Sequence, residues 1–291
     1  MSGTAGFDIR LFDDSATFQR DVLPMLYADP IGNNLLLGAF GRSLAEDVPG
    51  WLAAAYEGGR PALALARFGG FPFSLSIGAA EAAEPLAQAA AVHLLDVQGV
   101  TGPAASAEPF AAAFGKATGR AITSRVATRL YALRAVIDPA RPAAGRLRLA
   151  SALEAGWISD WLVAFAVEAG LSPGERRHDH MQAAVARRIA ARQQFIWEAA
   201  GRPVAIAAVV SIGVVGARIG GVYTLPDERG HGYASACVAA LSHHVLDEGR
   251  AWCALFADAA NPISNAIYQR LGYRANCLYR AFDFAAGSVG P

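Results

Sequence analysis

The second half of the chain alternates between two hydrophobic patterns. Apolar residues repeat every second position, or run without interruption, over short segments that predict strands. These strands are expected at residues 146–150, 193–199, 202–212, 217–225, 251–257 and 278–284. Helical spacing predicts helices at residues 153–170, 175–192, 233–245 and 261–272. The resulting order, β-α-α-β-β-β-α-β-α-β, predicts a mixed α/β (α+β) sheet.

Two of these helices have recognisable ends and faces. The helix after Gly232 carries its apolar residues on one stripe, formed by Ala234, Val238, Leu241 and Val245. The helix over residues 261–272 has Asn261 as its expected N-cap, Pro262 in its first turn and Gly272 at its end. Both patterns are typical of amphipathic helices that cover a sheet.

The first half of the chain has a weaker pattern. Helices are expected near residues 17–28 and 44–57, and strands near 62–68 and 73–80, with a further α/β pattern beyond them. The two halves show no exact sequence repeat, although a shared fold is compatible with such divergence.

A proline- and glycine-containing stretch, residues 138–145, separates the halves and reads as a linker. We therefore predict an N-terminal accessory domain over residues 1–137 and a second domain over residues 146–291, each near the common domain size.

The overall composition narrows the class of protein. Of the 291 residues, 54% are hydrophobic and 17% are charged, which favours packed cores over disorder. The formal net charge is zero, and this disfavours nucleic acid as a partner. No uninterrupted apolar run reaches the length of a membrane span, and the N-terminus has no signal-peptide pattern. We expect a cytoplasmic monomer or homodimer without a membrane partner.

Cysteine and histidine spacing does not favour a metal site or a disulfide framework. The cysteines are Cys237, Cys253 and Cys277, and the first two lie in apolar, core-like surroundings. Four of the six histidines occur as two close pairs, His178 with His180 and His243 with His244. Neither pair has a third ligand at the spacing that zinc or iron sites need, so no metal is expected.

The stretch 226–234 carries the strongest chemical signal. Arg229, Gly230 and Gly232 stand between a predicted strand and a predicted helix. Helix N-termini present unpaired N–H groups and a positive dipole, and glycines allow an anion to approach them. The pattern indicates a site for a small anion such as a phosphate; a plain glycine-rich turn is the alternative.

The same residues resemble a known family. The spacing Arg229-x-x-Gly232-x-Ala234 is similar to the (Q/R)-x-x-G-x-(G/A) loop of the GNAT superfamily of acyl-CoA N-acyltransferases. The buried strand at 251–257 and the helix at 261–272 resemble the elements that follow this loop in the family. The similarity extends over residues 146–284 and implies a GNAT fold with splayed central strands. The first half resembles the leading half of two-domain members of that superfamily.

The resemblance implies coenzyme A, as acetyl-CoA, for the cofactor. The implied pyrophosphate-binding residues are Arg229, His231, Gly232, Tyr233 and Ala234, with Gly230 shaping the turn. The strand edge at Val222, Tyr223 and Thr224 is implied to pair with the pantetheine arm. Asn261 and Asn265 are implied to lie near the cofactor. A helix cap is the alternative for Asn261, and a solvent-facing position for Asn265.

Tyr268 matches the tyrosine that the family often uses as general acid toward the departing thiolate. A core tyrosine is the alternative. The resemblance implies direct attack in a ternary complex, without a covalent enzyme intermediate. Glu168, Tyr223 and Asp258 are candidates for the general base, and a water chain is a further one.

The expected reaction is transfer of an acetyl group to a primary amine on a small molecule or peptide. A non-catalytic acyl-CoA sensor and an acyltransferase for longer acyl groups remain open. The first half lacks a matching loop, so one coenzyme A per chain is expected. A basic cluster on the second helix, either a solvated face or a surface selecting acidic acceptors, comprises Arg176, Arg177, Arg187, Arg188 and Arg192.

Overall fold

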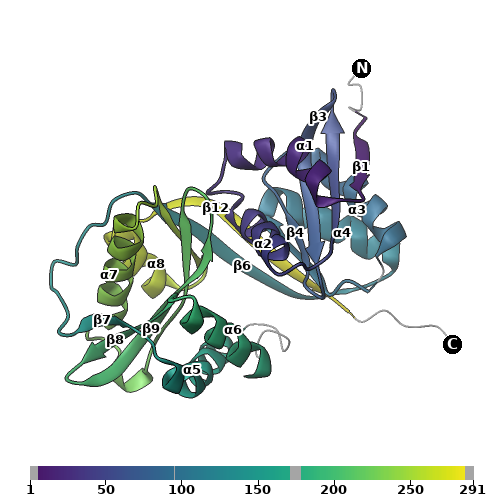
Figure 1. The fold of residues 1–291 in the computed structure, drawn as a ribbon. Helices are drawn as coiled ribbons and strands as arrows, with labels where there is room; N and C mark the ends of the chain where they lie inside the picture. Colours follow the sequence, from purple (N-terminus) through teal and green to yellow (C-terminus); the bar gives the residue numbers. More distant parts are fainter. Residues whose placement is uncertain (1–5, 95, 171–177, 286–291) are drawn as a thin grey trace. The chain divides into compact units, whose positions relative to one another are not determined.

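The computed structural model describes residues 6–94, 96–170 and 178–285, which form two compact units (Figure 1). Unit 1 comprises Met1–Arg129 and Asn276–Pro291, and unit 2 comprises Leu130–Ala275. The chain leaves unit 1 within strand β6 and returns to it within strand β12. The predicted limits 1–137, 138–145 and 146–291 divide the chain differently and stay a prediction.

Both halves of the chain contain the same ten-element order. The first half contains β1 (Asp8–Phe12), α1 (Ser15–Ala28), α2 (Asn34–Ala45), β2 (Gly50–Glu57), β3 (Arg60–Phe68), β4 (Phe73–Leu75), α3 (Ala83–His93), β5 (Gly99–Pro103), α4 (Ala104–Thr118) and β6 (Ile122–Leu133). The second contains β7 (Arg146–Leu149), α5 (Ala155–Glu168), α6 (His178–Ala190), β8 (Gln194–Ala199), β9 (Arg202–Ile212), β10 (Ala217–Thr224), α7 (Tyr233–Asp247), β11 (Cys253–Asp258), α8 (Pro262–Arg270) and β12 (Arg274–Phe284).

This order confirms the α/β reading of the second half. It also shows that the halves repeat one topology. Short 3₁₀ turns, η1 (Ala80–Ala82), η2 (Ala152–Glu154) and η3 (Pro226–Glu228), precede α3, α5 and α7. Among the described residues, no helix has the length and apolar character needed to cross a membrane.

In each unit, the sheet incorporates the last strand of the other half of the sequence. The strand order of unit 1 is β1-β2-β3-β4-β5-β12, and β12 pairs antiparallel with β5. The order in unit 2 is β6-β11-β10-β9-β8-β7. The two halves of the sequence therefore exchange their final strands.

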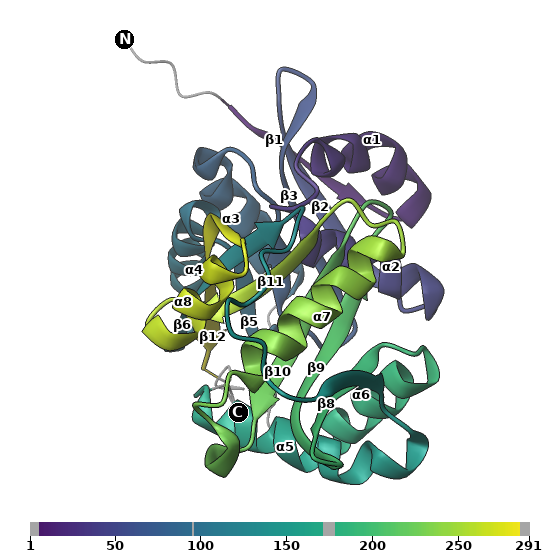
Figure 2. The same cartoon turned by 90° about the vertical axis from the view of Figure 1, so that its left-hand side faces the viewer.

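Helices cover both faces of the sheet in unit 2. Helix α7 packs along one face through Val238, Leu241 and Val245, all nearly fully buried (Figure 2). Helices α5 and α6 cover the opposite face, where their residues pack against Ile196 and Tyr223. Because side chains alternate along a strand, adjacent residues of one strand enter different cores.

Unit 1 has the same layered arrangement around its own sheet. Helices α3 and α4 pack on one face, and Phe110 and Phe114 of α4 are fully buried there. Helices α1 and α2 cover the other face through residues that include Phe18 and Phe40. Phe282 and Phe284 of β12 complete the first of these cores.

One predicted helix of the first half is wrong. Residues 44–57 do not form a helix: α2 ends at Ala45, and Gly50–Glu57 form β2, which pairs antiparallel with both β1 and β3. The Pro49-Gly50 sequence ends helical geometry. The alanines that favour a helix lie instead in a central strand with both faces buried, where pairing overrides propensity.

Other local predictions are confirmed in detail. The side chain of Asn261 caps α8 by accepting hydrogen bonds from the amides of Ile263 and Ser264, each at 3.1 Å. Cys237 and Cys253 are fully buried, and burial raises the pKa of each thiol to about 12. Both thiols therefore stay protonated and act as core residues.

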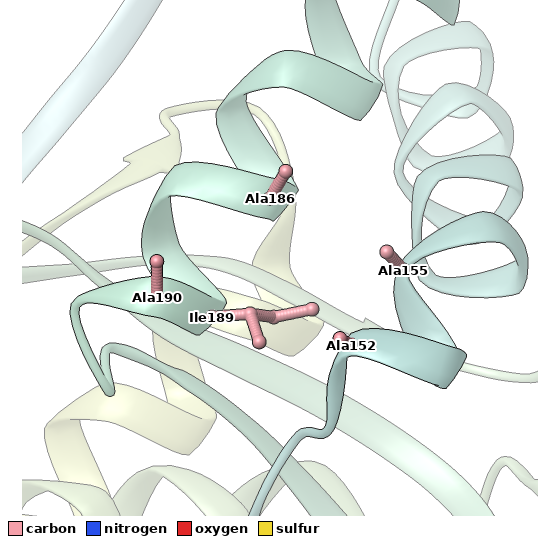
Figure 3. A pocket seen from close by; sticks show the side chains of 5 residues that line it. All are labelled: Ala152, Ala155, Ala186, Ile189 and Ala190. Atoms are coloured by element: carbon pink, nitrogen blue, oxygen red, sulfur yellow. The ribbon is translucent and has the colours of Figure 1, made fainter.

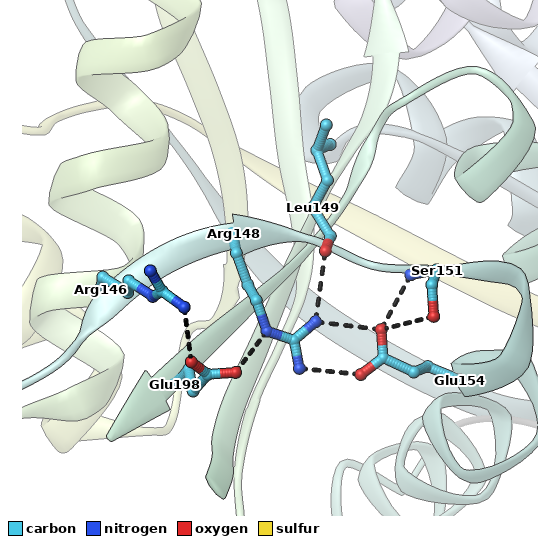
Figure 4. Close-up of polar contacts among 6 residues, drawn as sticks. All are labelled: Arg146, Arg148, Leu149, Ser151, Glu154 and Glu198. Atoms are coloured by element: carbon cyan, nitrogen blue, oxygen red, sulfur yellow. Dashed lines mark hydrogen bonds and ion pairs between the residues drawn. The ribbon is translucent and has the colours of Figure 1, made fainter. Parts of the chain in front are cut away.

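A charged network connects β7, η2 and β8 in unit 2 (Figure 4). Arg148 of β7 donates to Glu198 of β8 at 2.6 Å and to Glu154 of η2 at 2.8 Å. Glu154 also accepts from the amide and hydroxyl of Ser151, which completes a capping box. Arg146 reaches only Glu198, at 3.1 Å. Arg148 thus joins the edge strand, its neighbour and the entry to α5.

Arg148→Met is expected to lower the melting temperature by about 2–4 °C at pH 7. This is the shift expected in a unit of this size if the network contributes roughly 1 kcal/mol or more to the free energy of unfolding. Hydrogen bonding to Arg148 lowers the pKa of Glu154 below its usual 4.5. The stabilisation is therefore complete above about pH 4.5 and is lost as the pH falls through the lowered value. The difference between wild type and variant should shrink in melts below pH 4.5.

The matched control is Arg146→Met, because the side chain of Arg146 is 74% exposed and makes one contact. We expect it to change the melting temperature little. An equal loss in both variants would contradict the central role of Arg148.

Candidate functional site

Strands β10 and β11 part in the middle of the unit 2 sheet. Their parallel pairing ends at Ile219 and Leu255, although β10 continues to Thr224 and β11 to Asp258. The register of β10 against β9 also shifts between Gly220 and Tyr223, which marks a bulge. Among the described residues, the edge of β10 that faces β11 is therefore without a ladder partner over residues 220–224.

Two consecutive glycines make this bulge sterically acceptable. Gly221 adopts a φ of +60°, a conformation that favours glycine, and a Cβ there would come within 3.1 Å of Leu162. The splayed central strands that the resemblance implies are present here, but the bulge at Gly220 and Gly221 was not predicted. The signal available was the Gly220-Gly221 pair itself, since glycines inside a strand often mark a bulge or a close backbone approach.

The loop after β10 leads into an uncapped helix. Gly230 and Gly232 have φ values of +84° and +80°, and no side chain caps α7. The amide N–H groups of residues 230 and 232–235 have no acceptor within the described part of the chain, and the first internal bond runs from Ala236 to the carbonyl of Gly232. Five free donors at a helix N-terminus are the arrangement that binds anions in many proteins, and this group of amides is called the amide nest below.

The side chain of Arg229 does not extend freely at the rim of this nest. Its Nη2 atom lies 2.8 Å from Oε2 of Glu168, at the end of α5, and its Nε donates to the carbonyl of Thr224 at 3.2 Å. The positive charge of Arg229 is thus compensated by a carboxylate. An anion in the nest would be held mainly by backbone amides and the helix dipole.

Glu168 also binds the second base candidate. The hydroxyl of Tyr223 donates to Oε1 of Glu168 at 3.0 Å, and the ring packs between Trp161 and Phe165. Burial, and then Glu168, raises the pKa of Tyr223, so this phenol stays protonated and is a poor base. The third candidate, Asp258, is exposed at the end of β11 and accepts from the amide of Ala260.

The remaining loop residues lie around the nest. His231 is exposed, with Nδ1 at 3.2 Å from the carbonyl of Glu228, and its ring stacks on that of Tyr233 at 5.6 Å. Ala234 is half-buried, and so are Val222 and Thr224 on the unpaired strand edge. All the predicted pyrophosphate and pantetheine positions therefore lie along the exit of β10 and the start of α7.

Asn265 is engaged inside the protein. Its amide nitrogen donates to the carbonyls of Asp258 and Asn261, at 3.0 and 2.7 Å, while its oxygen accepts from the hydroxyl of Tyr131 at 2.9 Å. Sequence analysis did not identify Tyr131, which lies 134 positions away in the chain. These bonds hold the end of β11, the start of α8 and β6 together.

Tyr268 of α8 is buried, with 8% of its surface exposed. Its ring centroid lies 6.3 Å from that of Tyr131 and 6.0 Å from that of Tyr273. Burial raises the pKa of Tyr268 to about 12, and its hydroxyl has no hydrogen-bond partner within the described ranges. The phenol is therefore a protonated donor without an internal acceptor.

Three histidines outside the loop, His178, His243 and His244, lie beside carboxylates. His178 lies 2.8 Å from Asp160, and His243 lies 2.9 Å from Asp138. No group of three or more potential metal ligands occurs among residues 6–94, 96–170 and 178–285. In the predicted basic cluster, Arg176 and Arg177 lie outside the described residues, whereas Arg187, Arg188 and Arg192 lie on or just after α6.

A small hollow of about 170 Å³ lies between α5 and α6 (Figure 3). Its lining consists of Ala152, Ala155, Ala186, Ile189 and Ala190. These side chains offer no polar group that would orient a ligand, so the hollow reflects the small alanine side chains on the facing helices.

The comparison with family models supports the same part of the chain. Residues 200–281 match the family described as FR47-like protein. This segment includes the bulged strand, the amide nest and α8. No curated protein matches the chain in a sequence comparison.

Solved structures extend the similarity to both units. A protein from Drosophila melanogaster is 16% identical with a TM-score of 0.65, covering 97% of this chain and 100% of that one. A GNAT-family acetyltransferase from Colwellia psychrerythraea is 13% identical with a TM-score of 0.56, covering 96% and 100%. A tandem GNAT protein from the clavulanic acid biosynthesis pathway is 17% identical with a TM-score of 0.51, covering 98% and 100%.

The repeated topology, the parted strands and the similar solved structures all indicate the same fold. The chain has the fold of the GNAT acetyltransferases, and the resemblance to the GNAT superfamily that its sequence indicates is confirmed.

Asn265→Ala is expected to destabilise unit 2 by about 1–3 kcal/mol, because it removes three hydrogen bonds and leaves their partners unpaired. Tyr131→Phe should cost about 1 kcal/mol. Since the two residues share one bond, the double variant should lose less than the sum, as measured by urea unfolding. Unchanged stability together with weakened coenzyme A binding would instead assign Asn265 to the ligand site.

Proposed function

We propose that the protein is an acetyl-CoA-dependent N-acetyltransferase whose site lies in unit 2. The observation that carries this proposal is the amide nest at the start of α7, beside the unpaired edge of β10. Five unpaired amides suit a pyrophosphate, and a free strand edge suits an amide-bearing arm. Coenzyme A combines these two chemical groups.

Each part of the cofactor has proposed partners in this chain. The amides of residues 230 and 232–235 would receive the pyrophosphate. The backbone of Val222, Tyr223 and Thr224 would pair with the pantetheine arm. Asn261 lies at the neighbouring helix start, with its side-chain oxygen already used as a cap. When bound, acetyl-CoA supplies the activated thioester.

Tyr268 is the proposed general acid. Its pKa of about 12 keeps the phenol protonated, and its hydroxyl has no partner among the described residues, so it is available to a departing thiolate. We propose direct attack by a neutral primary amine of a small molecule or peptide. A water chain is the favoured base, because Tyr223 stays protonated and Glu168 is bound to Arg229.

The corresponding loop of unit 1 supports a single cofactor site. After β4, the amide of Ile77 donates to Oδ1 of Asn33 at 2.7 Å, and the amide of Ala79 donates to the carbonyl of Ala62 at 2.9 Å. The amide of Ser76 is also bonded, to Ala64. In unit 1, η1 leads directly into α3, and the amides of Ala82 and Ala83 bond the carbonyls of Ala79 and Ala80, whereas residues 229–232 separate η3 from α7 in unit 2.

We expect calorimetric titration to give one coenzyme A per chain. Gly230→Asp should weaken binding about tenfold or more, because it places a negative charge at the nest. Gly230→Asn is the matched control, since both side chains tolerate a positive φ and no atom lies within 4 Å of a Cβ there. Two equivalents per chain, or equal losses in both variants, would overturn the assignment.

Tyr268→Phe should reduce turnover by about 10²-fold or more and leave coenzyme A affinity unchanged. The assay follows free thiol release with acetyl-CoA, longer acyl-CoAs and a panel of amines. Because the pKa is about 12, activity should not fall through Tyr268 below about pH 11. Full turnover in the variant would exclude Tyr268 as the acid, and binding without turnover for any amine would favour an acyl-CoA sensor.

A further inference from the structure

We propose that Glu168 is a positioning residue for the amide nest, acting through Arg229. The proposal deepens the assignment of the nest to coenzyme A and rests on it. Glu168 joins the end of α5 to the residue immediately before the first free amide, across 61 positions of sequence.

The two oxygens of the Glu168 carboxylate accept hydrogen bonds from different residues. Oε1 of Glu168 accepts from the hydroxyl of Tyr223 at 3.0 Å, and Oε2 accepts from Nη2 of Arg229 at 2.8 Å. The guanidinium also donates to the carbonyl of Thr224 and lies 5.6 Å from the centre of the Tyr223 ring. Arg229 is thereby fixed to the end of β10 and to α5 at once.

The backbone that follows Arg229 needs such a constraint. Gly230 and Gly232 have few conformational restrictions, and no atom lies within 4 Å of a Cβ at Gly230. The side chain of His231 contacts only the nearby carbonyl of Glu228 and the ring of Tyr233. The long-range bond of Arg229 therefore anchors the start of the nest and reduces the entropy lost when an anion binds.

If Glu168 positions the nest, its removal changes coenzyme A affinity in the direction opposite to the one that charge alone predicts. Glu168 places a negative charge near an anion site, so its removal should strengthen coenzyme A binding if only charge matters. If Glu168 holds Arg229 and the nest in place, its removal should weaken binding. The sign of the change distinguishes the two.

The experiment measures coenzyme A affinity by calorimetry for Glu168→Gln, Arg229→Gln and the double variant, with melting temperatures as a check on folding. We expect each single variant to bind about two- to fivefold more weakly, the range of an exposed ion pair, and the double variant to bind no more weakly than Arg229→Gln. Glu168→Ala repeats the test without a residual hydrogen bond.

Asp227→Asn is the matched control. It removes the same charge two positions before Arg229, from a carboxylate without an ion pair or hydrogen bond to any described residue. We expect affinity to stay equal or rise slightly in this variant.

Three results would overturn the proposal: tighter binding in Glu168→Gln, additive losses in the double variant, or unchanged affinity with loss of turnover. The last would make Glu168 the general base. Failure of the wild type to bind coenzyme A would instead reject the proposed function, so the two failures are distinguishable.

Discussion

The parting of β10 from β11 is the constraint on which the rest of unit 2 depends. Once pairing stops at Ile219 and Leu255, the backbone of β10 must find other partners or remain open. The bulge at Gly220 and Gly221 redirects the strand, and Tyr223 anchors its end in the α5 core. The open edge and the free amides of α7 then lie in direct succession along the chain, which is what a long, polar, phosphate-bearing ligand requires.

The two halves share one topology but differ in the backbone hydrogen bonds of the loop that joins β4 to α3 and β10 to α7. In unit 1 the carboxamide of Asn33, only 2% exposed, takes the amide of Ile77. In unit 2 a segment with two positive-φ glycines, residues 229–232, stands between η3 and α7, and the amides that follow it are free of acceptors among the described residues. The difference lies in backbone donors rather than in any catalytic side chain, so fold similarity alone does not tell the two units apart in function.

Most features that the sequence predicts correctly depend on residues that are close together in the chain. The Asn261 cap, the stripe on α7 and the glycine turn before α7 depend on neighbouring residues, and the structure contains all three. The anion site at Arg229 stays a prediction. The sequence predicts a helix over residues 44–57 because alanine favours helices. Pairing with β1 and β3 instead places residues 50–57 in a strand. The contacts of Arg229 with Glu168 and of Asn265 with Tyr131 join distant positions, and no short-range pattern encodes them.

The placement of β12 has a consequence for biosynthesis. Phe282 and Phe284 fill the core of unit 1, although the other residues of that core lie in the first 122 positions of the chain. A nascent chain therefore cannot complete its N-terminal unit until β12 has been synthesised, which comes after strands β7 to β11 in the chain. Unit 2 has all of its strands earlier, since β6 precedes it. Synthesis order thus favours maturation of the second unit before the first.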